Sequence, residues 1–158
     1  MDTSDIYLTR GGFEKLAQEL EMLKTVRRRE LSKAVGEARA QGDISENAEY
    51  DAAKDAQGMN EQRIAELEFK LSRARIIEHE NMSCDEVLIG ATVKLKDLET
   101  QEELVYILVS GEEADYTQNK ISIASPVGKA LLGHKKGAVI EIKIPAGTLK
   151  YKILNISR

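Results

Sequence analysis

The stretch that decides the fold is AQGDISENAEYDAAKDAQG, residues 40–58. It interrupts a long, proline-free and alanine-rich region at Gly42, and it then places Asp43, Glu46 and Glu49 three residues apart. Glycine is common at the position that ends a helix, and acidic residues are favourable in the first turn of the helix that follows. The stretch therefore predicts a turn between two helices, whose carboxylates serve either as a helix cap or as a chemical site.

Apolar residues recur at helical spacing on both sides of this turn, over residues 13–77. Large residues lie far from the turn and small ones lie near it, so the two series mirror each other. This pattern predicts an antiparallel coiled-coil hairpin with arms of about 29 residues, each about 45 Å long. The expected seam consists of Phe13, Leu16, Leu20, Leu23, Leu31, Ala34, Val35 and Ala38, facing Ala48, Ala52, Ala53, Ala56, Met59, Ile64, Leu67, Leu71 and Ala74. Thr9 is expected to cap the first helix.

Past His79 the pattern changes to an alternation with period two, which is typical of strands. The segment SPVGKALLG predicts a short helix that Ser125 caps, with Pro126 in its first turn and Gly133 at its end. We therefore expect an α+β protein, with a long helical hairpin over residues 1–79 and a small antiparallel β-sheet domain over residues 80–158. The expected strands lie within residues 87–98, 102–110, 120–125, 138–144 and 148–157.

Composition excludes several classes of protein. The net charge of −4 over 158 residues argues against a chain that holds nucleic acid by its overall field, so any such contact is local. Cys84 is the single cysteine, and the distant His79 and His134 are interpreted as surface residues, so no disulfide or zinc site is expected. No secretory or membrane-spanning apolar run is present. We expect a monomeric, cytoplasmic protein that does not contact a membrane.

The acidic turn has two interpretations that the residues alone leave open. In the first, Asp43 and Glu46 form a capping box for the second helix, after Gly42 closes the first one. In the second, the two carboxylates present hard oxygen ligands to Mg²⁺. Two carboxylates are too few to hold this ion tightly, so the remaining ligands would belong to another macromolecule.

Basic and aromatic residues near the turn allow the same two interpretations. Arg39 and Lys54 are suited to phosphate contacts, and Tyr50 is suited to stacking on a base. Each is also typical of a solvated helix surface. The run Arg27-Arg28-Arg29 spreads around the helix, which indicates solvation together with some contact to a partner.

At the level of whole motifs, the chain resembles the Gre family of bacterial transcript cleavage factors. The resemblance rests on LTRGGFEKLAQELEMLK, GDISENAEYDAAKDAQG, ISIASPVGKALLGHKKG and IPAGTLKYKILNI, and it covers essentially the whole chain. It implies an FKBP-like C-terminal domain that docks beside the secondary channel of RNA polymerase, while the hairpin passes down the channel. There the factor helps the polymerase to cleave backtracked nascent RNA at its 3′ end with Mg²⁺. The factor would thus be an accessory transcription elongation protein, not an enzyme, acting within a DNA-binding assembly.

The resemblance also implies roles for individual residues. Asp43 and Glu46 would be the acidic pair that shares Mg²⁺ with the polymerase. Support of the tip or contact with RNA would fall to Arg39, Asn47, Tyr50 and Lys54. Polymerase docking would fall to Ser125, Pro126, Gly128, Lys129, Ala130, Leu131 and Leu132. Relatives often carry a polar or acidic residue where this chain has Ala124, and an acidic residue where it has Ala138. These two differences bear on the details of docking.

Three rival hypotheses remain open at this stage. A Gre-like antagonist would occlude the same channel and inhibit the polymerase, although such paralogues carry a more aspartate-rich tip. A prolyl isomerase would need an aromatic pocket, and residues 80–158 offer only Tyr106, Tyr116 and Tyr151. A structural coiled-coil adaptor would need no chemistry at the tip, and the apolar seam alone is compatible with it.

Overall fold

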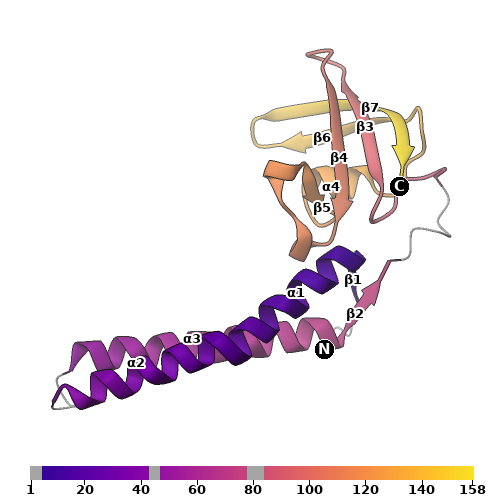
Figure 1. The fold of residues 1–158 in the computed structure, drawn as a ribbon. Coiled ribbons are helices and arrows are strands. Elements are labelled where there is room, and N and C mark those ends of the chain that lie inside the picture. Colours follow the sequence, from indigo (N-terminus) through magenta and orange to yellow (C-terminus); the bar gives the residue numbers. More distant parts are fainter. Residues whose placement is uncertain (1–4, 43–46, 78–83) are drawn as a thin grey trace. The chain divides into compact units, whose positions relative to one another are not determined.

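The computed structural model describes residues 5–42, 47–77 and 84–158 (Figure 1). The chain packs as two compact units. One unit is Phe13–Ala74, and the other combines the N-terminal segment up to Gly12 with Arg75–Arg158.

The first unit is the predicted helical hairpin. Its first arm runs through α1 (Arg10–Met22), a π-helical turn η1 (Leu23–Arg27) and α2 (Arg28–Ala40), and its second arm is α3 (Ala48–Ser72). In Figure 1, α2 and α3 lie side by side on either side of the turn. The π-helical turn was not expected from the apolar spacing.

The seam of the hairpin is buried for the most part as the sequence predicts. The buried seam residues are Leu16, Leu31, Val35, Ala38, Ile64 and Leu67. The prediction is wrong for Ala34, Ala48, Ala52 and Met59, which are exposed. Met59 is 72% exposed, whereas the neighbouring Asn60 is only 7% exposed and takes the seam position.

The base of the hairpin ends differently from the prediction. Thr9 does cap α1, because its hydroxyl accepts a hydrogen bond from the Gly12 N–H at 3.0 Å. The expected helix to Ile77 is wrong, because α3 ends at Ser72 and is followed by strand β2 (Ala74–Ile76). Strand β2 pairs with β1 (Ile6–Leu8), and the Ile77 N–H donates to the Leu8 carbonyl at 2.8 Å. Leu8 and Ile77 are both buried where the two segments pair.

The second unit contains a five-stranded sheet in the order β5-β4-β3-β7-β6. Its elements are β3 (Thr92–Asp97), β4 (Glu103–Val109), β5 (Lys120–Ser122), β6 (Val139–Ile144), β7 (Gly147–Ser157) and the short helix α4 (Pro126–Leu131). The sheet is antiparallel as predicted, except that β5 runs parallel to β4. A parallel pair needs a connection that returns the chain to the end of the sheet where the first strand began. The segment with the 3-10 turns η4 (Gly111–Glu113) and η5 (Tyr116–Gln118) provides it.

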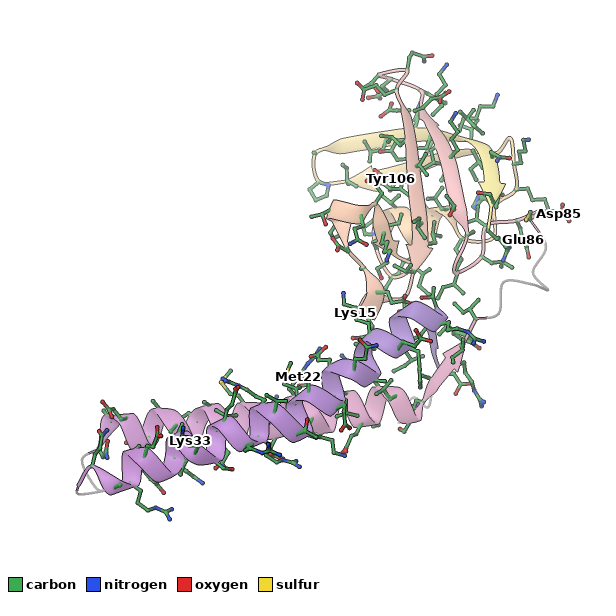
Figure 2. The ribbon with its side chains drawn as sticks, in the orientation of Figure 1. Lys15, Met22, Lys33, Asp85, Glu86 and Tyr106 are labelled. Atoms are coloured by element: carbon green, nitrogen blue, oxygen red, sulfur yellow. The ribbon has the colours of Figure 1, made fainter. Side chains whose placement is uncertain are left out.

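The core of this unit lies between the sheet and α4. Val93, Leu95 and Ile153 alternate with exposed or half-buried residues on their strands and are 0% exposed. Leu131 of α4 is also 0% exposed. Tyr106 lies on β4 (Figure 2) and packs against the same core. The predicted class, an α-helical hairpin followed by a small β-sheet domain with one short helix, is confirmed.

No helix in the described parts of the chain is long and apolar enough to cross a membrane.

Candidate functional site at the hairpin tip

The first arm ends where the sequence predicts. Helix α2 ends at Ala40, and the Gln41 N–H donates to the Ala38 carbonyl at 3.3 Å. Gly42 then adopts a φ of 141°. Side chains disfavour positive φ, so glycine is required at this position for the chain to leave the helix.

The second arm begins with an asparagine that bonds to both arms. The Asn47 side-chain oxygen accepts hydrogen bonds from the Glu49 and Tyr50 N–H groups, each at 3.1 Å. Its amide nitrogen donates to the Ala38 carbonyl of α2 at 2.6 Å. One side chain therefore caps α3 and joins the two arms beside the turn.

The capping-box interpretation of Asp43 and Glu46 is wrong, because α3 begins at Ala48 and its cap is Asn47. Glu49 and Asp51 are the acidic residues of its first turn. They supply the negative charge that the helix dipole favours. Asp43 and Glu46 themselves lie outside the described residues. Other side chains therefore provide the cap and the first-turn negative charge of α3.

Arg39 and Tyr50 lie against each other across the two arms. The Arg39 guanidinium carbon is 5.8 Å from the centre of the Tyr50 ring, which is within cation–π range. Arg39 is exposed, and Tyr50 is half-buried. The ring proposed to stack on a base is thus stacked on an arginine of the same protein.

Lys54 lies further along α3, where its ammonium donates to the Gln57 side-chain oxygen at 3.0 Å. It lines a shallow groove together with Arg28, Ser32, Gln57, Gly58 and Glu61. A neighbouring groove is lined by Lys24, Thr25, Arg28, Arg29 and Ser32. Sequence reasoning did not assign Lys24 or Arg28 to a site, although the arginine run at 27–29 was the available signal.

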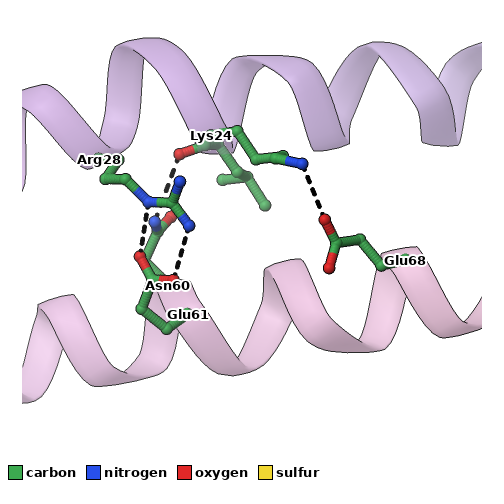
Figure 3. A network of polar contacts seen from close by, with 6 residues as sticks. Lys24, Arg28, Asn60, Glu61 and Glu68 are labelled. Atoms are coloured by element: carbon green, nitrogen blue, oxygen red, sulfur yellow. Dashed lines mark hydrogen bonds and ion pairs between the residues drawn. The ribbon is translucent and has the colours of Figure 1, made fainter.

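Ion pairs connect the two arms in the same region (Figure 3). Arg28 donates two hydrogen bonds to Glu61, at 2.8 and 2.7 Å, and Lys24 donates to Glu68 at 2.8 Å. In a third pair across the arms, Arg63 donates to Glu19 at 2.8 Å. The fork of Arg28 on Glu61 raises the pKa of the guanidinium and lowers the pKa of the carboxylate below its ordinary value of 4.5. The sequence indicates that the arginine run is solvated, but Arg28 of this run forms a contact between the two arms.

The Arg28–Glu61 pair leads to a pH-dependent prediction. Because the pKa of Glu61 is lowered by folding, its contribution to stability is complete above its unfolded pKa and is lost as the pH falls through the folded value. Glu61→Gln is expected to lower the melting temperature slightly at neutral pH and to have no effect at a pH below both pKa values. Thermal melts followed by circular dichroism across this range test it, with Gln62→Glu as a charge control. An unchanged difference between Glu61→Gln and the parent at low pH would contradict it.

Both family models that match this chain describe transcription elongation factors. The first, "Transcription elongation factor, N-terminal", matches residues 6–76, and the second, "Transcription elongation factor, GreA/GreB, C-term", matches residues 82–158. The chain belongs to the GreA/GreB family of transcription elongation factors.

Relatives agree over nearly the whole length of the chain. Transcription elongation factor GreA of Chloroherpeton thalassium is 50% identical over 150 residues, covering 95% of both chains. The GreA of Caldanaerobacter subterraneus subsp. tengcongensis is 51% identical over 153 residues, covering 97% of this chain and 98% of the relative. Among solved structures, GreA factor homolog 1 (Gfh1) of Thermus thermophilus is 36% identical, with a TM-score of 0.45, and covers 98% of this chain and all of that one.

The segment predicted to dock on the polymerase is α4 with its cap. The Ser125 hydroxyl accepts from the Gly128 N–H at 3.0 Å, and Pro126 occupies the first turn as predicted. A Cβ at Gly128 would lie 2.1 Å from the Ser122 carbonyl oxygen, so only glycine fits there. Leu131 is 0% exposed and Leu132 is 39% exposed. The predicted docking set thus divides into residues that build the helix and residues on the surface, which include Pro126, Lys129 and Leu132.

His134 is exposed, as the sequence predicts, and His79 lies outside the described residues. Cys84 is exposed as well. Tyr151 is in the core, where burial raises the pKa of its hydroxyl above the ordinary 10.0, and Tyr116 is 72% exposed. The aromatic walls that an isomerase pocket needs are therefore not supplied by these two side chains.

Proposed function

We propose that this protein stimulates RNA polymerase to cleave its own backtracked transcript, and that the acidic turn of the hairpin is the part that acts. In this proposal the hairpin enters the secondary channel, and the β-sheet unit docks beside the channel through the surface of α4. The factor contributes side chains to the active site of the polymerase and has no complete active site of its own.

The observation that carries the proposal is the cap of α3. Asn47 caps this helix, and Glu49 and Asp51 provide its first-turn charge, so neither Asp43 nor Glu46 is needed to begin it. Two carboxylates that are not needed to cap this helix, at the turn of a long hairpin, are available for chemistry. Membership of a family of transcription elongation factors supports the same role.

Magnesium fits the donor chemistry of Asp43 and Glu46, because carboxylate oxygens are its preferred protein ligands. Among the described residues, no group of three or more His, Cys, Asp or Glu side chains lies close enough together to hold a metal ion. We propose that the acidic pair completes a site whose other ligands belong to the polymerase. Bound there, the ion would activate water or stabilise the leaving oxygen of the cleaved phosphodiester.

Arg39, Tyr50 and Lys54 are proposed to serve the RNA in different ways. Arg39 is exposed above the Tyr50 ring, so its charge is directed to phosphate while the ring holds the guanidinium. Within the described part of the chain, the Lys54 ammonium bonds only to the neutral side chain of Gln57, so its charge suits a second phosphate. The net charge of −4 keeps such contacts local.

The direct test adds the purified chain to a halted, backtracked RNA polymerase complex that carries 3′-labelled RNA and Mg²⁺. Release of short labelled fragments, followed by renewed elongation, is the expected result. The same protein is also added to actively elongating complexes. Inhibition of elongation without cleavage of backtracked RNA would overturn the proposal in favour of a channel-occluding antagonist, and no effect on either complex would favour an adaptor.

The exposed end of α4 allows a separate prediction about docking. Leu132→Ala is expected to weaken polymerase binding roughly fivefold, as for loss of an interface side chain of moderate importance, with an unchanged melting temperature. Val139→Ala is the matched control, because Val139 is an apolar residue of the same unit and is 56% exposed. Fluorescence anisotropy of labelled factor against polymerase measures both. Equal affinities of the two variants would remove α4 from the docking surface.

A further inference from the structure

The first arm of the hairpin contains one residue more than its seam requires. Leu16, Leu20 and Leu23 follow the alternating steps of four and three residues that define a coiled-coil seam. A strict seven-residue repeat from Leu23 would next bring Glu30 onto the seam. Glu30 is exposed instead, and the buried residue is Leu31, one position later.

The π-helical turn absorbs this additional residue. Across it, the Arg28 N–H bonds to the Leu23 carbonyl, five residues earlier, where an α-helix would bond four residues earlier. The Thr25 hydroxyl donates to the Glu21 carbonyl at 2.7 Å and so satisfies an acceptor beside the turn. Without the turn, every side chain of α2 would be rotated by about 100° relative to α1.

A buried amide on the opposite arm meets the first carbonyl of this turn. Asn60 is 7% exposed, and its side-chain nitrogen donates to the Leu23 carbonyl at 3.3 Å (Figure 3). A buried amide is costly unless it is bonded, and a single asparagine in a coiled-coil seam selects one register at the expense of stability. The apolar neighbour Met59, which would pack on a seam more favourably, is exposed to water.

We propose that Asn60 sets the register of the hairpin by holding the π-helical turn of the facing arm. The turn brings Leu31, Val35 and Ala38 onto the seam, and the Ala38 carbonyl then meets Asn47 beside the tip. Asn60 is therefore a positioning residue that acts on the tip from a distance. Its partner is backbone, so the effect depends on the amide and not on charge.

Spin-label distances in the free protein test the register directly, in a Cys84→Ser background. One pair of labels, at Lys33 and Asp55, lies on exposed positions beyond the π-helical turn, and a second pair, at Gln18 and Ala65, lies on exposed positions nearer the base. A rotation of about 100° at an outer helix radius of about 5 Å moves an exposed side chain by about 8 Å. The two pairs therefore distinguish a rotated α2 from a general loosening of the hairpin.

Asn60→Leu is expected to give a second distance population for the 33/55 pair and an unchanged single distance for the 18/65 pair. A single asparagine in a seam selects the register at a cost in stability, and the Leu23 carbonyl still accepts a bond from the Arg28 N–H, so the melting temperature should not fall. Met59→Leu is the matched control, because Met59 is the exposed neighbour, and it should leave both distances unchanged. A single unshifted 33/55 distance in Asn60→Leu would overturn the proposal.

A deletion provides the rescue. Val26 lies within the π-helical turn and is 53% exposed, so removing it restores a seven-residue step from Leu23 to Leu31 without removing a seam residue. In the Asn60→Leu background, deletion of Val26 is expected to return the 33/55 pair to one distance. Persistence of two populations would contradict the assignment of the additional residue to this turn. These measurements need no polymerase, so their outcome is independent of the proposed function.

Discussion

Replacing Asp43 by Asn and Glu46 by Gln together is expected to reduce stimulated RNA cleavage by roughly 100-fold or more. Loss of outer groups around a metal site already costs about 10- to 100-fold in affinity or activity, and these two side chains are proposed as direct ligands. Helix α3 should remain intact, because its cap is Asn47 and its first-turn charges are Glu49 and Asp51. The measurement is the release of labelled RNA fragments from backtracked polymerase, with circular dichroism as the check on folding.

A carboxylate close by in sequence provides the matched control. Glu49→Gln removes a negative charge from an exposed position in the first turn of α3, where the charge interacts favourably with the helix dipole. This variant should cleave as the parent does and melt slightly earlier. If the double variant cleaves RNA as well as Glu49→Gln does, the acidic pair has no catalytic task and the hairpin acts by shape alone.

The elements of the fold that sequence predicts well are those fixed by local pattern. The hairpin arms follow from helical spacing over long segments, and Gly42 and Ser125 mark ends that depend on residues within one helical turn. The strands of the second unit follow from alternation. These predictions depend on residues that are close together in the sequence, so a short stretch of sequence is enough to make them.

The errors arise where a distant segment decides the outcome. Strand β2 replaces the last helical turn because β1, about seventy residues earlier in the chain, pairs with it. Asn60 takes the seam position in place of Met59, and its side chain bonds to a carbonyl in the π-helical turn of the facing arm. Neither partner is visible in a local window of sequence.

At the candidate site, sequence identified the residue types more reliably than their partners. Asn47 was assigned to support of the tip, and the structure gives that assignment a geometry of two capping bonds and one cross-arm bond. Tyr50 was considered as a base-stacking residue, and its ring is stacked on Arg39. The roles of Asp43 and Glu46 toward Mg²⁺ stay a prediction from sequence, because these residues lie outside the described ones.

Asn47→Ala is expected to destabilise the hairpin by about 2 kcal/mol. Loss of an N-cap typically costs about 1 kcal/mol. Loss of the bond to the Ala38 carbonyl, which belongs to a residue only 5% exposed, adds about 1 kcal/mol. Because the cross-arm bond joins the two ends of the turn, cleavage should also fall although both tip carboxylates are still present.

Asn47→Asp separates the two contributions of this side chain. A carboxylate accepts the Glu49 and Tyr50 N–H groups as the amide oxygen does, but it has no N–H to donate to Ala38. This variant should therefore lose about half as much stability as Asn47→Ala, about 1 kcal/mol, since the cap is kept and only the cross-arm bond is lost. Urea unfolding followed by far-UV circular dichroism measures both losses. Equal losses for the two variants would show that capping contributes nothing, whereas an unaffected Asn47→Asp would show that the arms are held together at the tip without this bond.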